Sequence, residues 1–235
     1  MSRDRLLDRI RAALAVPARI ATVHGVPRHV APPHGAPAEP GDRAAPGGAD
    51  EPPAGDPVAL FIERSGQVGA QVERVPSLAE AAARVVALCA ARGARTVSAW
   101  EAPGLDGVLA AVRGAGLTVL PADADPAAVA GAEVGITGAD WGIAESGTLA
   151  LASGPGRPRL TSLLPAVHVA VLRADRILPD LPALFARAGE LPSALTFITG
   201  PSRSADIGFT PVLGAHGPME VVVLVVEGDE RESLH

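Results

Sequence analysis

Apolar positions recur along the chain with two different periods, and these periods divide most of it into helices and strands. Short apolar runs typical of strands occur at 70–75, 95–100, 117–120 and 132–137. They alternate with runs of helical spacing at 61–69, 78–91 and 104–116. Strands that alternate with helices of this length predict βαβ units and a mainly parallel sheet.

The rhythm changes after residue 140. Two strand-like runs follow each other closely within 141–154, which predicts an antiparallel hairpin or a bend. Further strands are expected at 168–178, 194–200 and 217–229, with a helix at 178–189. The pattern therefore predicts an α/β fold with one mixed, mainly parallel sheet flanked by helices.

The N-terminal part differs in composition. Ser2 can cap a short helix to about Ala15, in which four apolar residues form an amphipathic stripe, Leu6, Leu7, Ile10 and Leu14. Residues 17–57 are dense in proline, glycine and alanine, which indicates a linker or an extended segment without its own core. The predicted organisation is an N-terminal helix and extended segment over 1–57, an α/β domain over 58–228 and a tail over 229–235. Whether the helix packs on its own domain or binds a partner stays open.

Composition narrows the classes of function. The formal net charge is −6 and aromatic residues make up only 3% of the chain, so neither a basic stripe nor a stacking platform favours nucleic acid. All basic residues are arginine, which excludes a lysine Schiff base and a P-loop lysine. The chain has no apolar run long enough for a membrane helix and no signal-like N-terminus, so a cytoplasmic protein is expected.

A single cysteine, Cys89, lies in an apolar run. One thiol can form no internal disulfide and cannot hold an iron–sulfur cluster by itself. We expect it to be a small buried residue. No metal site is predicted, because the three histidines of the linker lack helical spacing and acidic or cysteine partners.

Three glycine-rich polar segments fall at predicted strand ends, at 135–148, 152–165 and 199–218. In open α/β sheets, ligands bind outside the carboxyl ends of the strands. None of the segments contains a dinucleotide fingerprint, a P-loop, a GxSxG elbow or an HExxH motif. The segments therefore predict a binding surface without naming its chemistry.

The first segment supplies a candidate catalytic carboxylate. Glu145 could act as base or nucleophile if it is desolvated, or it could cap a turn or pair with an arginine. Ser146, Gly147 and Thr148 could donate hydrogen bonds to an anion, and the second segment adds Ser153 and Gly154 to this binding set.

The arginines are the second group of candidates. Five of them fall in the last hundred residues, at Arg157, Arg159, Arg173, Arg176 and Arg203. We single out Arg203, which follows a strand beside Ser202 and could be oriented by Asp206, because guanidinium groups suit carboxylates and phosphates.

Two histidines remain to be assigned. His216 lies between glycines and could act as general acid or base. His168, inside an apolar run, is expected in the core.

Taken together, GITGADWGIAESGTLAL, SGPGRPRLTSLLPAVHVAVLRADRI, TFITGPSRSADI and GAHGP resemble the LUD-domain family over about 58–227. The resemblance implies a fold similar to the NagB/RpiA/CoA-transferase superfamily. It also implies work beside two iron–sulfur proteins that oxidise L-lactate to pyruvate. With one cysteine, this chain would carry no cofactor of its own, and the redox centres would lie in the partners. Relatives often have an acidic or amide residue where this chain has Gly208, and threonine where it has Ser146.

Three functions stay open. The first is a subunit of an L-lactate oxidation system that binds a small carboxylate or other anion through Arg203 and the nearby backbone amides. The second is a separate enzyme of the CoA-transferase or sugar-isomerase kind that uses Glu145, because the ESG turn is similar to the glutamate turn of family I CoA transferases and GAD at 138–140 is similar to a loop of ribose-5-phosphate isomerases. The third is a non-catalytic assembly or regulatory protein that binds its partner through residues 1–56.

Overall fold

The structure is a computed structural model that describes residues 56–187, 192, 194–204, 212–213 and 217–228. The predicted N-terminal helix, the C-terminal tail and the linker up to residue 55, with its three histidines, lie outside these residues. So do Asp206, Gly208 and His216. The assignment of the last two residues to the linker is wrong, because Asp56 caps the helix Pro57–Gln67 and Pro57 begins it.

A six-stranded sheet forms the centre of the described domain, and every neighbouring pair in it is parallel. Its order is β1-β12-β7-β4-β2-β3, with bounds β1 Gln71–Val75, β12 Glu220–Val226, β7 Val167–Arg173, β4 Val134–Gly138, β2 Thr96–Ala99 and β3 Thr118–Leu120. The two long central strands read EVVVLVV and VHVAVLR because layers on both faces bury them.

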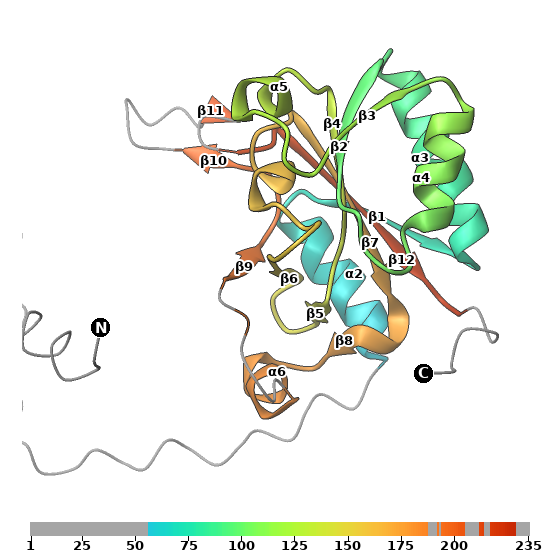
Figure 1. Ribbon diagram of the computed structural model, residues 1–235. Coiled ribbons are helices and arrows are strands. Elements are labelled where there is room, and N and C mark those ends of the chain that lie inside the picture. Colours follow the sequence, from blue (N-terminus) through green and yellow to red (C-terminus); the bar gives the residue numbers. More distant parts are fainter. Residues whose placement is uncertain (1–55, 188–191, 193, 205–211, 214–216, 229–235) are drawn as a thin grey trace, which may run out of the picture. The chain divides into compact units, whose positions relative to one another are not determined.

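Helices α3 (Leu78–Ala91) and α4 (Asp106–Gly114) lie on one side of the sheet, and α2 (Pro57–Gln67) lies on the other (Figure 1). Ser77 caps α3 as the sequence predicts, because its hydroxyl accepts a hydrogen bond from the Glu80 amide at 3.2 Å. Cys89 is fully buried in α3, and burial raises the pKa of its thiol, which confirms the expectation of a small core residue.

The antiparallel strands form sheets of their own, so the prediction of one mixed sheet is wrong. Strands β5 (Trp141–Ile143) and β6 (Thr148–Ala152) make the predicted hairpin within a four-stranded sheet of order β8-β5-β6-β9. The other strands are β8 (Ile177–Leu178) and β9 (Leu195–Ile198), and a third sheet pairs β10 (Arg203–Ser204) with β11 (Val212–Leu213). The hairpin packs on the large sheet instead of extending it, and Gly142 allows this close approach because an added Cβ would meet Leu172 and Phe61.

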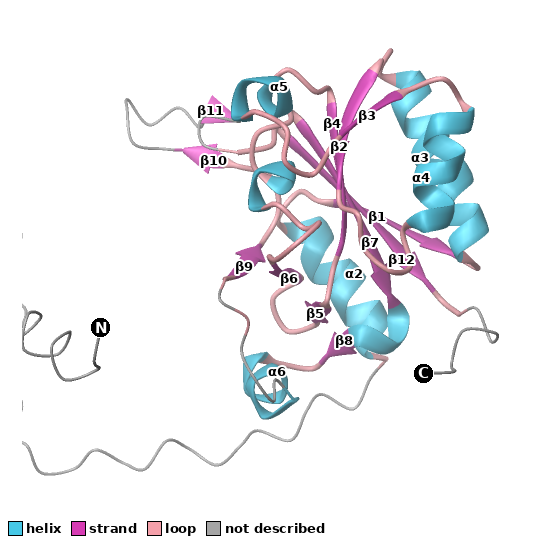
Figure 2. Cartoon of the chain, viewed as in Figure 1, coloured by secondary structure: helices cyan, strands magenta, loops and turns pink. Residues whose placement is uncertain are grey.

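The predicted strand over 168–178 is also divided. A 3-10 turn, η2 (Ala174–Arg176), separates β7 from β8, so the chain leaves the large sheet and enters the small one within three residues. Figure 2 shows the remaining short elements around the two sheets, namely α5 (Pro126–Ala130), α6 (Leu181–Arg187) and the 3-10 turn η1 (Arg159–Ser162). None of the helices in the described ranges combines the length and apolar character needed to cross a membrane.

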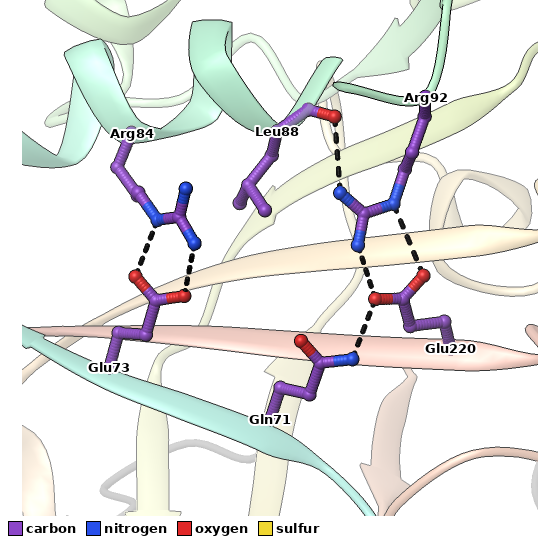
Figure 3. A network of polar contacts seen from close by, with 6 residues as sticks. All are labelled: Gln71, Glu73, Arg84, Leu88, Arg92 and Glu220. Atoms are coloured by element: carbon purple, nitrogen blue, oxygen red, sulfur yellow. Dashed lines mark hydrogen bonds and ion pairs between the residues drawn. The ribbon is translucent and has the colours of Figure 1, made fainter. Parts of the chain in front are cut away.

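Ion pairs join α3 and its C-cap residue Arg92 to two strands of the large sheet (Figure 3). Arg84 donates to both carboxylate oxygens of Glu73 at 2.5 and 2.6 Å, and this contact lowers the pKa of Glu73. Arg92 likewise binds both oxygens of Glu220, which also accepts from Gln71 at 2.8 Å. Glu220 and Gln71 begin their strands, so this network lies at the edge opposite the carboxyl ends and serves the packing of α3.

A buried polar row crosses the middle of the sheet. Ser98, Gly135 and His168 are paired side by side on β2, β4 and β7. The Ser98 hydroxyl lies 2.9 Å from that of Thr161 on η1, and an added Cβ at Gly135 would overlap the Thr161 carbonyl oxygen. The glycine therefore lets η1 lie directly on the sheet.

His168 is in the core, as expected, with an exposed fraction of 0%. Its Nε2 lies 2.8 Å from the Thr137 hydroxyl, while its Nδ1 is buried with no partner within the described residues. Burial lowers the pKa of His168 to about 4, because the charged imidazolium would lose its hydration.

Replacing Gly135 with alanine should destabilise the protein by about 1–3 kcal/mol, because η1 has to move away from the sheet. Urea unfolding measures the loss. Gly107→Ala is the matched control, since no atom lies within 4 Å of an added Cβ and helix α4 gains an alanine. Equal stability for the two variants would contradict the close approach.

The free energy of unfolding should fall as the pH is lowered from about 6.5 to about 4. The unfolded chain takes up a proton on His168 near pH 6.5, whereas the folded chain does not until about pH 4. The loss approaches roughly 3 kcal/mol at the lower end of this window. The carboxylates whose pKa is lowered have ordinary values of 3.8 to 4.5, so their loss of stability begins only near the lower end of this window.

Urea unfolding of wild type and His168→Gln across pH 4–8 measures this effect, and the variant should show a flatter profile. NMR titration of the wild-type ring gives a reading that needs no variant. A His168 ring that titrates near pH 6.5 in the folded protein would contradict the assignment.

Candidate functional site

The carboxyl ends of β2, β4 and β7 meet at one edge of the large sheet, because these three strands are parallel neighbours. Each strand leads directly into a residue with a large or charged side chain. Trp100 follows β2, Asp140 lies two residues beyond β4, and Arg173 ends β7. Parallel pairing thus collects at one edge side chains that lie far apart in the sequence.

A pocket of about 310 Å³ lies at this edge. We name it the arginine pocket, after the three guanidinium groups in its wall. Its lining residues are Trp100, Ala102, Pro103, Leu105, Gly138, Ala139, Asp140, Trp141, Arg157, Arg173 and Arg176.

The loop that carries Arg157 is fastened to the segment after β2. The Trp100 indole donates to the Pro158 carbonyl at 3.0 Å, and the Glu101 amide donates to the Gly156 carbonyl at 2.8 Å. Gly156 has a φ of 70°, and an added Cβ there would approach the Glu101 carbonyl oxygen at 2.6 Å. Glycine at this position therefore permits both the backbone conformation and the contact.

The Arg157 guanidinium is held in place from two sides. Its carbon lies 4.5 Å from the centre of the Trp100 ring, a cation–π arrangement. Its Nη2 donates to Asp140 at 2.5 Å, and the same carboxylate oxygen accepts from the Ala152 amide at 2.7 Å. Its Nε is buried and has no partner within the described residues, so the guanidinium keeps unused hydrogen-bond donors.

The other two arginines lie where β7 leads into η2, with Arg173 at the end of β7 and Arg176 at the end of η2. Arg173 donates from Nε and Nη2 to Asp175 at 3.1 Å, and this contact, with a smaller effect of Arg176, lowers the pKa of Asp175. Arg176 is exposed and makes no hydrogen bond or ion pair with another described residue.

The charges of this region favour an anion with a single charge. Three guanidinium groups face two carboxylates, those of Asp140 and Asp175. Over these five groups, one positive charge is left in a chain whose formal net charge is −6. A carboxylate would neutralise it and use the remaining guanidinium donors.

The predicted residues around Glu145 lie elsewhere. The turn at 144–147 joins β5 to β6, whereas Asp140 lies beyond the opposite end of this hairpin. Glu145 and Ser146 are exposed, so the structure gives no desolvation of the Glu145 carboxylate. Gly147 has a φ of 65° and is pressed against α2, where its carbonyl accepts from the Ser65 hydroxyl at 3.1 Å.

A short chain of hydroxyl groups marks this second location. The Thr148 hydroxyl lies 2.7 Å from that of Ser146 and 2.7 Å from that of Thr199, which follows β9. We name Ser146, Thr148 and Thr199 the hydroxyl cluster. The sequence reasoning did not single out Thr199. It lies opposite Thr148 because β6 and β9 are antiparallel.

The rest of the predicted binding set is divided between the two locations. Ser153 and Gly154 follow the end of β6 that is near the arginine pocket, and the Ser153 hydroxyl is buried without a partner within the described residues. Ser202 and Arg203 come shortly after Thr199, with the exposed Arg203 guanidinium against Gly69 at the end of α2. Arg203 does not line the arginine pocket.

Sequence reasoning grouped five arginines, of which Arg157, Arg173 and Arg176 line the arginine pocket, but gave the binding role to Arg203. It gave no role to Trp100, which directly follows β2, or to Asp140, which lies two residues beyond β4. No group of three or more histidine, cysteine, aspartate or glutamate side chains that could hold a metal ion is found among the residues that the structure describes.

Comparison with known proteins identifies relatives. Lactate utilization protein C of Halalkalibacterium halodurans is 45% identical over 103 residues, which cover 41% of this chain and 45% of the relative. Lactate utilization protein C of Geobacillus sp. is 43% identical over 102 residues, 40% of this chain and 42% of the relative. The uncharacterized protein YkgG of Escherichia coli is 42% identical over 103 residues, 41% of this chain and 45% of the relative. Each match spans less than half of the relative.

A solved structure supports the fold. The crystal structure of a DUF162 family protein from Deinococcus radiodurans superimposes with a TM-score of 0.51 at 24% identity, covering 72% of this chain and 96% of that one. The LUD domain family itself matches residues 58–226, which include every strand of both larger sheets and the whole arginine pocket. The chain therefore belongs to the LUD domain family.

Proposed function

We propose that this chain is the anion-binding subunit of an L-lactate utilisation system, and that its arginine pocket binds a small carboxylate. The observation that carries the proposal is the geometry of Arg157, Arg173 and Arg176 at the carboxyl ends of the strands. The names of the two lactate utilization protein C relatives supply the metabolic context.

The binding chemistry follows from how the three guanidinium groups are held. Arg157 is positioned by Trp100 and Asp140 before any ligand arrives, so little side-chain entropy is lost on binding. Arg176 is exposed and interacts with Asp175 only through its charge, so its guanidinium can turn toward the second carboxylate oxygen. Asp140 orients Arg157 and reduces the local charge, which disfavours anions with several charges.

Electron transfer would be the work of partner proteins. The single cysteine is buried in α3 and burial raises the pKa of its thiol, so it is a poor ligand for a cluster. We therefore place the iron–sulfur clusters in partner proteins in the cytoplasm, with this chain contributing a carboxylate site and no cofactor of its own.

A second candidate places the chemistry at the other end of β6. The hydroxyl cluster lies beside Glu145, and Arg203 follows Thr199 on the same segment. These groups form a second candidate anion-binding site. A transferase or isomerase that uses Glu145 would need its substrate at this location. The exposure of Glu145 makes it the weaker candidate.

Arg176→Gln should weaken the binding of L-lactate or pyruvate at least tenfold, because a charge-assisted hydrogen bond is lost. Calorimetric titration measures the affinity. Arg113→Gln is the matched control, since Arg113 is exposed on α4 and lies outside the pocket. Arg203→Gln tests the second location. Loss of binding in Arg203→Gln with wild-type affinity in Arg176→Gln would move the site to the hydroxyl cluster.

No covalent adduct should form on Glu145 when the protein is incubated with acyl-CoA thioesters, because this carboxylate is exposed and lies outside the arginine pocket. Mass spectrometry of wild type beside Glu145→Gln provides the check. An adduct present in the wild type and absent in the variant would establish the transferase function instead.

A further inference from the structure

The arginine pocket is larger than lactate requires. We infer that its ligand is a monocarboxylic acid whose apolar body is larger than the methyl group of lactate or pyruvate, in contact with Ala102, Pro103 and Leu105. This inference rests on the proposed function, because it assumes that the arginine pocket is the carboxylate site.

The volume is the first observation. A pocket of about 310 Å³ corresponds to roughly ten water molecules at about 30 Å³ each. Lactate and pyruvate have only six non-hydrogen atoms. Either acid would leave part of the pocket to water, and that part is the one without polar side chains.

The lining is the second observation. The loop after β2 contributes Ala102, Pro103 and Leu105, and the end of β4 contributes Gly138 and Ala139. None of these residues has a side-chain donor or acceptor. A sugar or polyol would leave hydroxyl groups unpaired against this wall, whereas hydrocarbon loses nothing there.

The strand order gives the third observation. Arg173 ends β7 and Arg176 follows it, the apolar wall follows β2, and β4 lies between these strands. Two strand spacings amount to roughly 10 Å. The carbon chain of a three-carbon acid spans only about 2.5 Å with bonds of about 1.5 Å. An acid that reaches both walls at once therefore needs a longer body.

The net charge around the arginines restricts the number of carboxylates that the ligand has. The pocket lining carries three arginines and Asp140, and Asp175 binds Arg173 beside it, so these five groups leave one positive charge for one carboxylate. A longer dicarboxylate would place its second charge against the apolar wall. The ligand that fits both the charge and the wall therefore has one carboxylate and an aliphatic or aromatic body.

The experiment uses the two tryptophans of the chain, Trp100 and Trp141, as reporters. Both line the pocket and the chain has no tyrosine, so fluorescence excited at the indole band reports this site. The full-length protein is titrated with L-lactate, L-2-hydroxybutyrate, L-2-hydroxyisocaproate and L-phenyllactate. Affinity should rise about fourfold for each added methylene group that the wall covers.

Ala102→Leu tests the wall itself. The larger side chain fills the apolar end and should bring the affinities of the longer acids down toward that of lactate. Ala110→Leu is the matched control, because Ala110 is exposed on α4 outside the pocket, and it should keep the wild-type gain with length. Circular dichroism confirms that each variant is folded.

The outcomes separate this inference from the proposed function. Lactate binding as tightly as the longer acids, with Arg176→Gln still weakening all of them, would overturn the inference and leave the carboxylate site intact. A gain with length that is unchanged in Ala102→Leu would also overturn it. If no acid binds the wild type, or if Arg176→Gln has no effect, the proposed function fails and the inference fails with it.

Discussion

Parallel pairing of the central strands is the constraint on which the rest of this structure depends. β7 and β12 are buried on both faces, so their side chains can serve only the core. Functional groups are thereby confined to the strand ends, and pairing in parallel brings the ends of β2, β4 and β7 to one edge. The Arg92–Glu220 ion pair lies at the opposite edge, where β12 begins, and the carboxyl edge holds the arginine pocket.

The close contact between η1 and the sheet also determines the position of Arg157 in the arginine pocket. Gly135 and the hydroxyl groups of Ser98 and Thr161 let η1 lie on β4 and β2. The residues just before η1 carry Arg157, which Trp100 and Asp140 then orient. The packing of η1 on the polar row of the core therefore determines where the positive charge of Arg157 lies.

Much of the fold was predictable from sequence because its signals are local. Alternating helices and strands, the Ser77 cap and the 141–154 hairpin all follow from residues near one another in the chain. The separation into distinct sheets was not predictable in this way, since it depends on Gly142 meeting Leu172 and Phe61, and on η2 ending β7. These are contacts between distant segments, and the spacing of apolar residues along the sequence does not predict them.

In the candidate site, too, the local features were predictable from the sequence and the tertiary contacts were not. The glycine-rich segments marked the strand ends correctly, but the choice among five arginines depended on sheet order, which brings Arg157, Arg173 and Arg176 together and places Arg203 beside α2. Trp100 and Asp140 carried a signal in their position after a strand. The hydrogen bond from Trp100 to Pro158 spans 58 positions and that from Arg157 to Asp140 spans 17, so these contacts are tertiary information.

The most direct test of the account is a crystal structure of the protein soaked with 4-bromobenzoate, a monocarboxylate whose bromine is located by anomalous scattering. The account predicts the carboxylate at Arg157 and Arg176 and the bromine against the wall formed by Ala102, Pro103 and Leu105. Bromine located beside Ser146, Thr148 and Thr199, with the arginine pocket empty, would contradict it.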